Sequence, residues 1–415
     1  MKKFVAILFA VAMVCSTALP AAVSASAADT SSLAGTTINV YNWGEYISDG
    51  SEGSMDVNAE FTKRTGIKVN YNNYDTNENM YAKLKSDGVS FDIVIPSDYM
   101  IERLIAEGML QKIDFSNIPN YKYIDAKYKG LYFDPEDAYS VPYNVGMVGL
   151  IYNTKLVKEA PTSWSVMWDE QYKGKILMFD NPRDAFGIAQ KLLGQSFNTT
   201  DEAEWKAAAE KLKEQKPVLQ GYVMDDIFRK MENGEAAIAP YYAGDFITMY
   251  DNNPDLAFVY PQEGVNVFVD SICIPKNAKN KAAAEAYINF LLDPDIAVEN
   301  ANYLGYATPN TAVLARDDYE LKGNEYLYPT QEKMPKTEYF YNLPQNTLTL
   351  MTDLWSELKA SQSGEAGQEQ KTDYTWLYIG IGAVAVIAAG VIAYKVIQKK
   401  KRDFADAEDL SLIHI

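Results

Sequence analysis

The chain has 415 residues, a formal net charge of −18, one histidine and two cysteines. Because the histidine is His414, almost at the end, the rest of the chain has no Ser–His–Asp triad, no Cys–His pair and no histidine metal ligand, although a carboxylate-pair glycosidase stays open. The negative charge serves solubility, and it also attracts cations and repels nucleic acid. We therefore expect no catalytic residue, no metal, no cofactor and no nucleic-acid partner.

The first residues have the features of a secretory signal peptide. Residues 1–27 contain two lysines, an apolar run at 4–14 and small residues at 24–27, so we expect cleavage near Ala27. A lipid anchor on Cys15 is the alternative, but the residues before Cys15 fit the lipoprotein pattern poorly. The chain that follows is expected to lie outside the cytoplasm.

Strands and helices then alternate. Trp43 and Tyr46 follow the first strand, and Ser97 and Tyr99 follow the third, where the chain turns. This alternation predicts a mostly parallel sheet covered by helices on both faces, with ligands bound beyond the carboxyl ends of the strands. We expect strands at 38–43, 67–74 and 91–96 and helices at 56–66, 75–88 and 100–110.

A second half begins near residue 139 with another apolar strand. Within 173–194 a strand precedes a helix, for which Asn181 is a suitable N-cap and Asp184 lies in the first turn. An acid there complements the helix dipole or binds a ligand, and the pattern leaves both possibilities open. Residues 234–250 are expected to be a strand that ends in Tyr242 and Asp245.

Asp270 is the most unusual residue of the chain. It interrupts the apolar strand at 265–275, where an unpaired carboxylate would cost several kcal/mol. It is therefore either held by backbone N–H groups or serves as the counter-charge of a bound cation. Cys273 in the same strand has no partner cysteine in the exported chain and is expected to be a buried, unreactive thiol.

The chain ends in a predicted membrane anchor. Residues 374–398 are long and apolar enough to span a bilayer, aromatic residues stand at one edge, and basic residues at 399–402 follow the other. A buried core helix is the alternative. We expect a flexible linker at 360–373, a transmembrane helix at 374–398 and a cytoplasmic tail at 399–415.

Several segments, in order, resemble the spermidine/putrescine-binding proteins of bacterial ABC importers, of the periplasmic-binding-protein superfamily, type II. The resemblance covers about residues 36–359. It is carried by YNWGEYIS, FDIVIPSDYM, TSWSVMWDEQYKGKI, GYVMDDIFRKMENGEAAIAPYYAGD and VFVDSICIPKNAKNKAAAEAYINFLLDPDIAVENANYLGYATPN.

The resemblance assigns ligand-binding roles by position. Asn181 stands where spermidine binders have an acid, and the residue near Tyr341, often glutamine there, is not clearly aligned. Both departures favour putrescine over spermidine. The residues that match the family's binding positions are Trp43, Tyr46, Ser97, Tyr99, Asp184, Tyr242 (where tryptophan is usual), Asp245, Phe268, Asp270 and Tyr306.

The resemblance also implies an architecture and partners. We expect a two-lobed α/β ectodomain with crossing hinge strands, in which residues 36–146 and 270–311 form lobe 1 and residues 147–269 and 312–359 form lobe 2. It would be a monomeric polyamine receptor that delivers ligand to ABC permease subunits, and not an enzyme. A type II receptor for another cationic solute, or a membrane-anchored surface enzyme or adhesin, is the alternative.

Overall fold

The computed structural model describes residues 30–86, 88 and 90–361. Within them no helix has both the length and the apolarity that a bilayer crossing needs. The predicted signal peptide, transmembrane helix and cytoplasmic tail lie outside these residues, as does nearly all of the predicted linker. Of that linker the structure describes two residues: Ala360 is the last residue of a helix and Ser361 is its C-cap.

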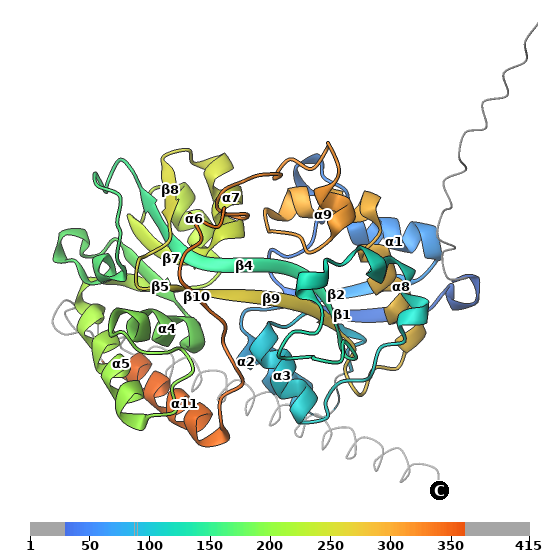
Figure 1. Ribbon diagram of the computed structural model, residues 1–415, viewed down its shortest axis with the longest axis horizontal. Coiled ribbons are helices and arrows are strands. Elements are labelled where there is room, and N and C mark those ends of the chain that lie inside the picture. Colours follow the sequence, from blue (N-terminus) through green and yellow to red (C-terminus); the bar gives the residue numbers. More distant parts are fainter. Residues whose placement is uncertain (1–29, 87, 89, 362–415) are drawn as a thin grey trace, which may run out of the picture. The chain divides into compact units, whose positions relative to one another are not determined.

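The strands of the described residues form one ten-stranded sheet with the order β2-β1-β3-β9-β4-β7-β5-β6; β8 pairs with β4 and β10 with β9. The two longest strands, β4 and β9, lie side by side through its middle (Figure 1). The strands are β1 (Thr37–Trp43), β2 (Lys68–Tyr74), β3 (Ile93–Val94), β4 (Ser140–Asn153), β5 (Ile176–Phe179), β6 (Leu219–Val223), β7 (Ile238–Tyr242), β8 (Leu256–Val259), β9 (Val265–Cys273) and β10 (Thr337–Glu338).

Helices flank both ends of this strand pair. Those at the β1–β3 end are α1, α2, α3, α8 and α9, and those at the β5–β8 end are α4, α5, α6, α7 and α11 (Figure 1). Their bounds are α1 (Val57–Thr65), α2 (Asn77–Lys85), α3 (Asp98–Ala106), α4 (Pro182–Leu192), α5 (Glu202–Gln215), α6 (Asp226–Glu232), α7 (Ala243–Asn252), α8 (Lys281–Leu291), α9 (Pro294–Leu304), α10 (Thr311–Leu314) and α11 (Gln345–Ala360).

The prediction of a mostly parallel sheet is only half right. The outer pairs β1–β2, β1–β3, β5–β6 and β5–β7 are parallel, as strand–helix–strand units require. The centre is antiparallel, because β4 pairs with β9, β7 and β8 in that direction. Periodicity alone predicted the strand–helix–strand units, but it did not predict that the long strands β4 and β9 run antiparallel.

Two predicted strands are shorter than expected. The strand at 91–96 is reduced to Ile93–Val94, with Pro96, which has no N–H to donate, just beyond it. The strand predicted at 234–250 ends at Tyr242, and α7 follows, with Phe246 and Met249 buried one helical turn apart. Asp245 is therefore in the first turn of a helix, not in a strand.

Three other local predictions are confirmed. Asn181 caps α4, with its side chain accepting from the Arg183 N–H. Gly66 ends α1 at a φ of 73°, a left-handed conformation that favours glycine. Cys273 is a fully buried free thiol.

Candidate ligand-binding pocket

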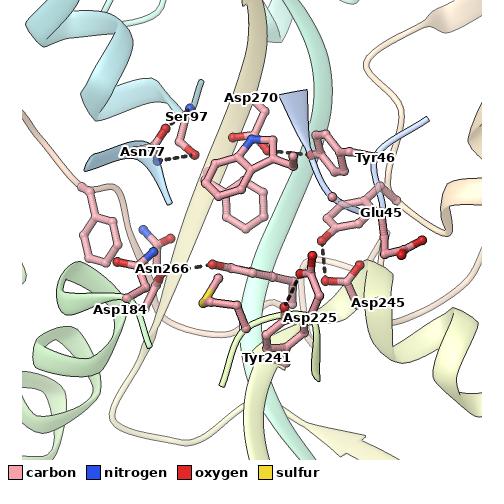
Figure 2. Close-up of a pocket in the computed structure, with 18 of the residues that line it drawn as sticks. Glu45, Tyr46, Asn77, Ser97, Asp184, Asp225, Tyr241, Asp245, Asn266 and Asp270 are labelled. Atoms are coloured by element: carbon pink, nitrogen blue, oxygen red, sulfur yellow. Dashed lines mark hydrogen bonds between the residues drawn. The ribbon is translucent and has the colours of Figure 1, made fainter. Parts of the chain in front are cut away.

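The ten predicted site residues come together. All of them line one pocket beside β9, with about 650 Å³ of space not filled by atoms. Figure 2 shows Asp184, Asp245 and Asp270 at separate positions around it. The ten are Trp43, Tyr46, Ser97, Tyr99, Asp184, Tyr242, Asp245, Phe268, Asp270 and Tyr306.

These side chains reach the pocket from several kinds of backbone position. Trp43 and Tyr242 end strands, as expected. Asp184 and Asp245 lie in the first turns of helices, where the dipole favours an acid. Phe268, like Asp270, lies inside β9 rather than at its end, and the two share a face because side chains alternate along a strand.

Asp270 has one carboxylate oxygen that is paired and one that is not. The residue is 3 % exposed. Its Oδ2 accepts a hydrogen bond of 2.6 Å from the Tyr46 hydroxyl, whereas its buried Oδ1 has no partner among the described residues. Burial raises the pKa of Asp270 to about 6, and the neighbouring hydroxyls of Tyr46 and Ser97 oppose that rise. The free oxygen is a ready acceptor for a donor that enters the pocket.

Two other buried acids are each paired with a phenol. The Tyr242 hydroxyl donates to Asp184 Oδ2 at 3.0 Å, and the Tyr306 hydroxyl donates to Asp245 Oδ2 at 2.9 Å. Burial raises the pKa of Asp184 to about 7 and raises that of Asp245 well above its usual range. These carboxyls become easier to ionise when a cation is placed against them.

Sequence reasoning did not place three further carboxylates in the site. Glu45, Asp98 and Asp225 also line the pocket. Asp98 is held by the backbone N–H groups of Tyr99 and Val269. Asp225 comes shortly after β6, so it could have been found by looking for side chains just beyond the carboxyl ends of strands.

The pocket is therefore acidic and aromatic. Among the described residues that line it, none is lysine, arginine or histidine. The described part of the chain also contains no cluster of three acidic, histidine or cysteine side chains suited to a metal ion. Aromatic faces and carboxylates together favour an organic cation over an anion or a sugar.

Two glycines let opposite walls of the pocket approach each other. A Cβ on Gly44, just after β1, would lie 2.1 Å from Asp225 Oδ2. One on Gly244, in α7, would lie 2.4 Å from the Tyr306 ring. In both places, segments from the two ends of the strand pair approach each other closely.

Comparisons with known proteins agree with this geometry. Residues 57–325 match the family model for bacterial extracellular solute-binding proteins. The chain is 37% identical to the spermidine/putrescine-binding periplasmic protein of Salmonella typhimurium, over 79% of this chain and 92% of the relative. It is 30% identical to a putrescine/cadaverine-binding protein of Pseudomonas aeruginosa, over 77% and 92%.

Solved structures resemble it as well. A putative spermidine/putrescine ABC transporter protein from Listeria monocytogenes matches with a TM-score of 0.75 and 36% identity, over 79% of this chain and all of that one. A substrate-binding protein of a spermidine/putrescine ABC transporter from Streptococcus pneumoniae matches with a TM-score of 0.64 and 34% identity, over 78% and 98%.

Proposed function

The chain belongs to the bacterial extracellular solute-binding protein family, with an α/β fold like that of periplasmic binding proteins, and we propose that it is a polyamine receptor of an ABC importer. This is a family of receptors rather than enzymes, as the sequence predicted. The observation that carries the choice of ligand is the buried Asp270 carboxylate with one free oxygen in an aromatic pocket that has no basic lining residue.

A polyamine fits because it is a flexible hydrocarbon with ammonium groups at intervals. Its methylenes would lie between aromatic rings such as those of Trp43 and Phe268, which attract the adjacent positive charges by up to ~2 kcal/mol when desolvated. Its ammonium groups would donate to Asp270 and to Asp184 or Asp245, in charge-assisted hydrogen bonds. Separate acids around one cavity suit a ligand with separate charges.

The proposed ligand order is putrescine ahead of spermidine. The neutral Asn181 lines the pocket with Asp184, so this end has one carboxylate fewer than expected for a spermidine binder. A third ammonium group buried near Asn181 would cost several kcal/mol unless Asp184 reached it.

The receptor would work as two lobes. Lobe 1 would comprise 36–146 and 270–311, and lobe 2 would comprise 147–269 and 312–359, with β4 and β9 as the hinge between them. The protein would face outward as a monomer, anchored by 374–398, and its closed form would present a surface to the permease. The meeting of Gly44 with Asp225 and of Gly244 with Tyr306 supports closure around the pocket.

Putrescine should therefore compact the protein. Small-angle scattering of the ectodomain should give a smaller radius of gyration with saturating putrescine than without it, because ligand closes the lobes. The Asp270→Asn variant, at the same putrescine concentration, serves as the unbound control. An unchanged radius for the parent protein at saturation would contradict the hinge.

The stability of the ligand-free protein and the increase in stability produced by putrescine should depend on pH in opposite ways. The pKa values of Asp184 and Asp270, about 7 and about 6, exceed the unfolded value near 3.9, so the folded protein binds more protons. The ligand-free midpoint of thermal unfolding should therefore fall as pH rises from about 5 to about 8. The increase produced by putrescine should grow over that range, because ammonium groups need ionised carboxylates. An increase that does not vary with pH, or none at any pH, would count against the proposal.

A further inference from the structure

A buried arginine lies just behind the wall of this cation pocket. Arg183, beside Asp184 in the first turn of α4, is 1 % exposed and does not line the pocket. A guanidinium keeps its positive charge under all ordinary conditions. So close to a pocket for cations, its charge would repel the ligand and compete with it for Asp184.

The ring of Phe340 separates this charge from the pocket. It lines the pocket, is 4 % exposed and has its centroid 4.5 Å from the guanidinium carbon of Arg183. The guanidinium donates to the carbonyl oxygens of Phe197 at 2.8 Å and Tyr341 at 3.1 Å. Neither of these acceptors belongs to a residue that lines the pocket, so the hydrogen bonds of Arg183 hold it behind the ring.

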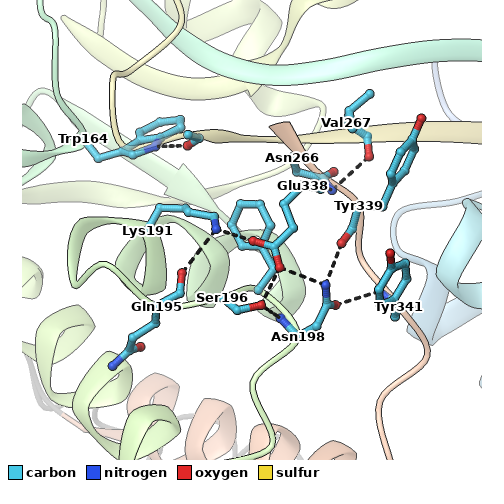
Figure 3. A network of polar contacts seen from close by, with 12 residues as sticks. Trp164, Lys191, Gln195, Ser196, Asn198, Asn266, Val267, Glu338, Tyr339 and Tyr341 are labelled. Atoms are coloured by element: carbon cyan, nitrogen blue, oxygen red, sulfur yellow. Dashed lines mark hydrogen bonds and ion pairs between the residues drawn. The ribbon is translucent and has the colours of Figure 1, made fainter. Parts of the chain in front are cut away.

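Asn198 connects the arginine to the segment that carries Phe340. Figure 3 shows its contacts with Glu338, Tyr339 and Tyr341. Its amide nitrogen donates to Glu338 Oε1 at 3.1 Å and to the Tyr339 carbonyl at 2.8 Å. Its amide oxygen accepts from Arg183 Nη2 at 3.0 Å and from the Tyr341 N–H at 2.8 Å. One side chain thus fixes the residues on both sides of Phe340 together with the charge that the ring covers.

Two further contacts brace this arrangement. Glu338 also pairs with Lys191 of α4 and accepts from the Ser196 hydroxyl, so the loop around Asn198 and the Phe340 segment are joined twice. The Asn342 N–H also donates, at 2.7 Å, to Oε2 of Glu102, which lies in α3 at the other end of the strand pair. The position of Phe340 is therefore set by polar contacts outside the pocket.

We infer that Asn198 is a positioning residue for ligand binding: it pins Phe340 over Arg183 and so keeps a positive charge out of the pocket. The inference rests on the proposed function. Without Asn198, Arg183 loses one of its three acceptors, and the residues on each side of Phe340 lose one hydrogen bond. The guanidinium can then approach Asp184 and compete with the ligand's ammonium group for that carboxylate.

The test is a titration of Asn198→Ala with putrescine. Affinity should fall about tenfold, the size expected for a residue coupled through one neighbour. In an Arg183→Gln background the same substitution should change affinity by less than about twofold. Asn253→Ala is the matched control. The side-chain amide of Asn253 makes similar hydrogen bonds, to the backbone of Met231 and Asp255, away from the pocket, so this substitution should affect only thermal stability.

A second readout needs no arginine variant. Titrating in two buffers of different ionisation enthalpy measures the protons released when putrescine binds. At neutral pH the parent should release protons from Asp184, and Asn198→Ala should release fewer, because Arg183 already ionises that carboxyl. Parental affinity and proton release in Asn198→Ala, or an equal loss with and without Arg183, would overturn the inference. A parent protein that binds no polyamine would instead overturn the proposed function.

Discussion

Replacing Asp270 with asparagine should weaken polyamine binding by about 2–5 kcal/mol, because it removes one partner of a desolvated charge pair. The carboxylate is buried inside β9, and only one of its oxygens is paired within the protein. Asparagine keeps the size and can still accept from Tyr46, but it has no charge to offer an ammonium group. Equilibrium titration of parent and variant at about pH 8 measures the loss.

Asp92→Asn is the matched control for this change. Asp92 is also buried, at 1 % exposure, but it accepts from the backbone N–H groups of Asn39, Lys279 and Asn280 and does not line the pocket. Its substitution should lower the midpoint of thermal unfolding and leave affinity nearly unchanged. If Asp270→Asn titrated like the parent, Asp270 would be a structural acid and the cation would bind elsewhere.

Gly244→Ala should have the second largest effect. Its new Cβ would lie 2.4–2.6 Å from three ring atoms of Tyr306, which is buried and donates to Asp245. Relief requires the two proposed lobes to separate, at a cost of about 1–3 kcal/mol to the closed form. Affinity for putrescine should fall by about tenfold or more, and scattering at a fixed ligand concentration should show a larger radius.

A second glycine supplies the control for that experiment. Gly221 in β6 has no heavy atom within 4 Å of an added Cβ, so Gly221→Ala should bind as the parent does. The affinity of Gly44→Ala should lie between those of Gly244→Ala and Gly221→Ala, because the atoms that its Cβ meets belong to the end of the Asp225 side chain, which can rotate away. Equal affinities for all three variants would show that closure does not depend on these approaches.

Much of the pocket could be predicted from the sequence because its chemistry is unusual there. An acid inside an apolar strand, as at Asp270, has few structural explanations, and aromatic residues at strand ends are equally conspicuous. The family resemblance supplied the rest of the ten residues. All ten line the pocket, and their part in binding remains a proposal.

What could not be predicted depends on contacts between distant segments. The approach of Gly44 to Asp225 joins two loops whose neighbourhood no local pattern encodes. The role inferred for Asn198 likewise depends on its contacts with residues 338–341, which are far away in the sequence. The residues after Tyr242 include types that favour strands, but they form the helix α7, one face of which is buried. Tertiary contacts therefore override local preference here.

Calorimetric titration of the protein with putrescine, cadaverine, spermidine, spermine and butylamine at about pH 8 would show whether it is a polyamine receptor. We expect saturable binding of one putrescine per chain, weaker binding of spermidine, and weaker binding still of butylamine, which would leave one buried carboxylate unpaired. Spermidine binding as tightly as putrescine would overturn the order but not the ligand class. If none of the polyamines gave a heat of binding with the folded protein, the protein would not be a polyamine receptor.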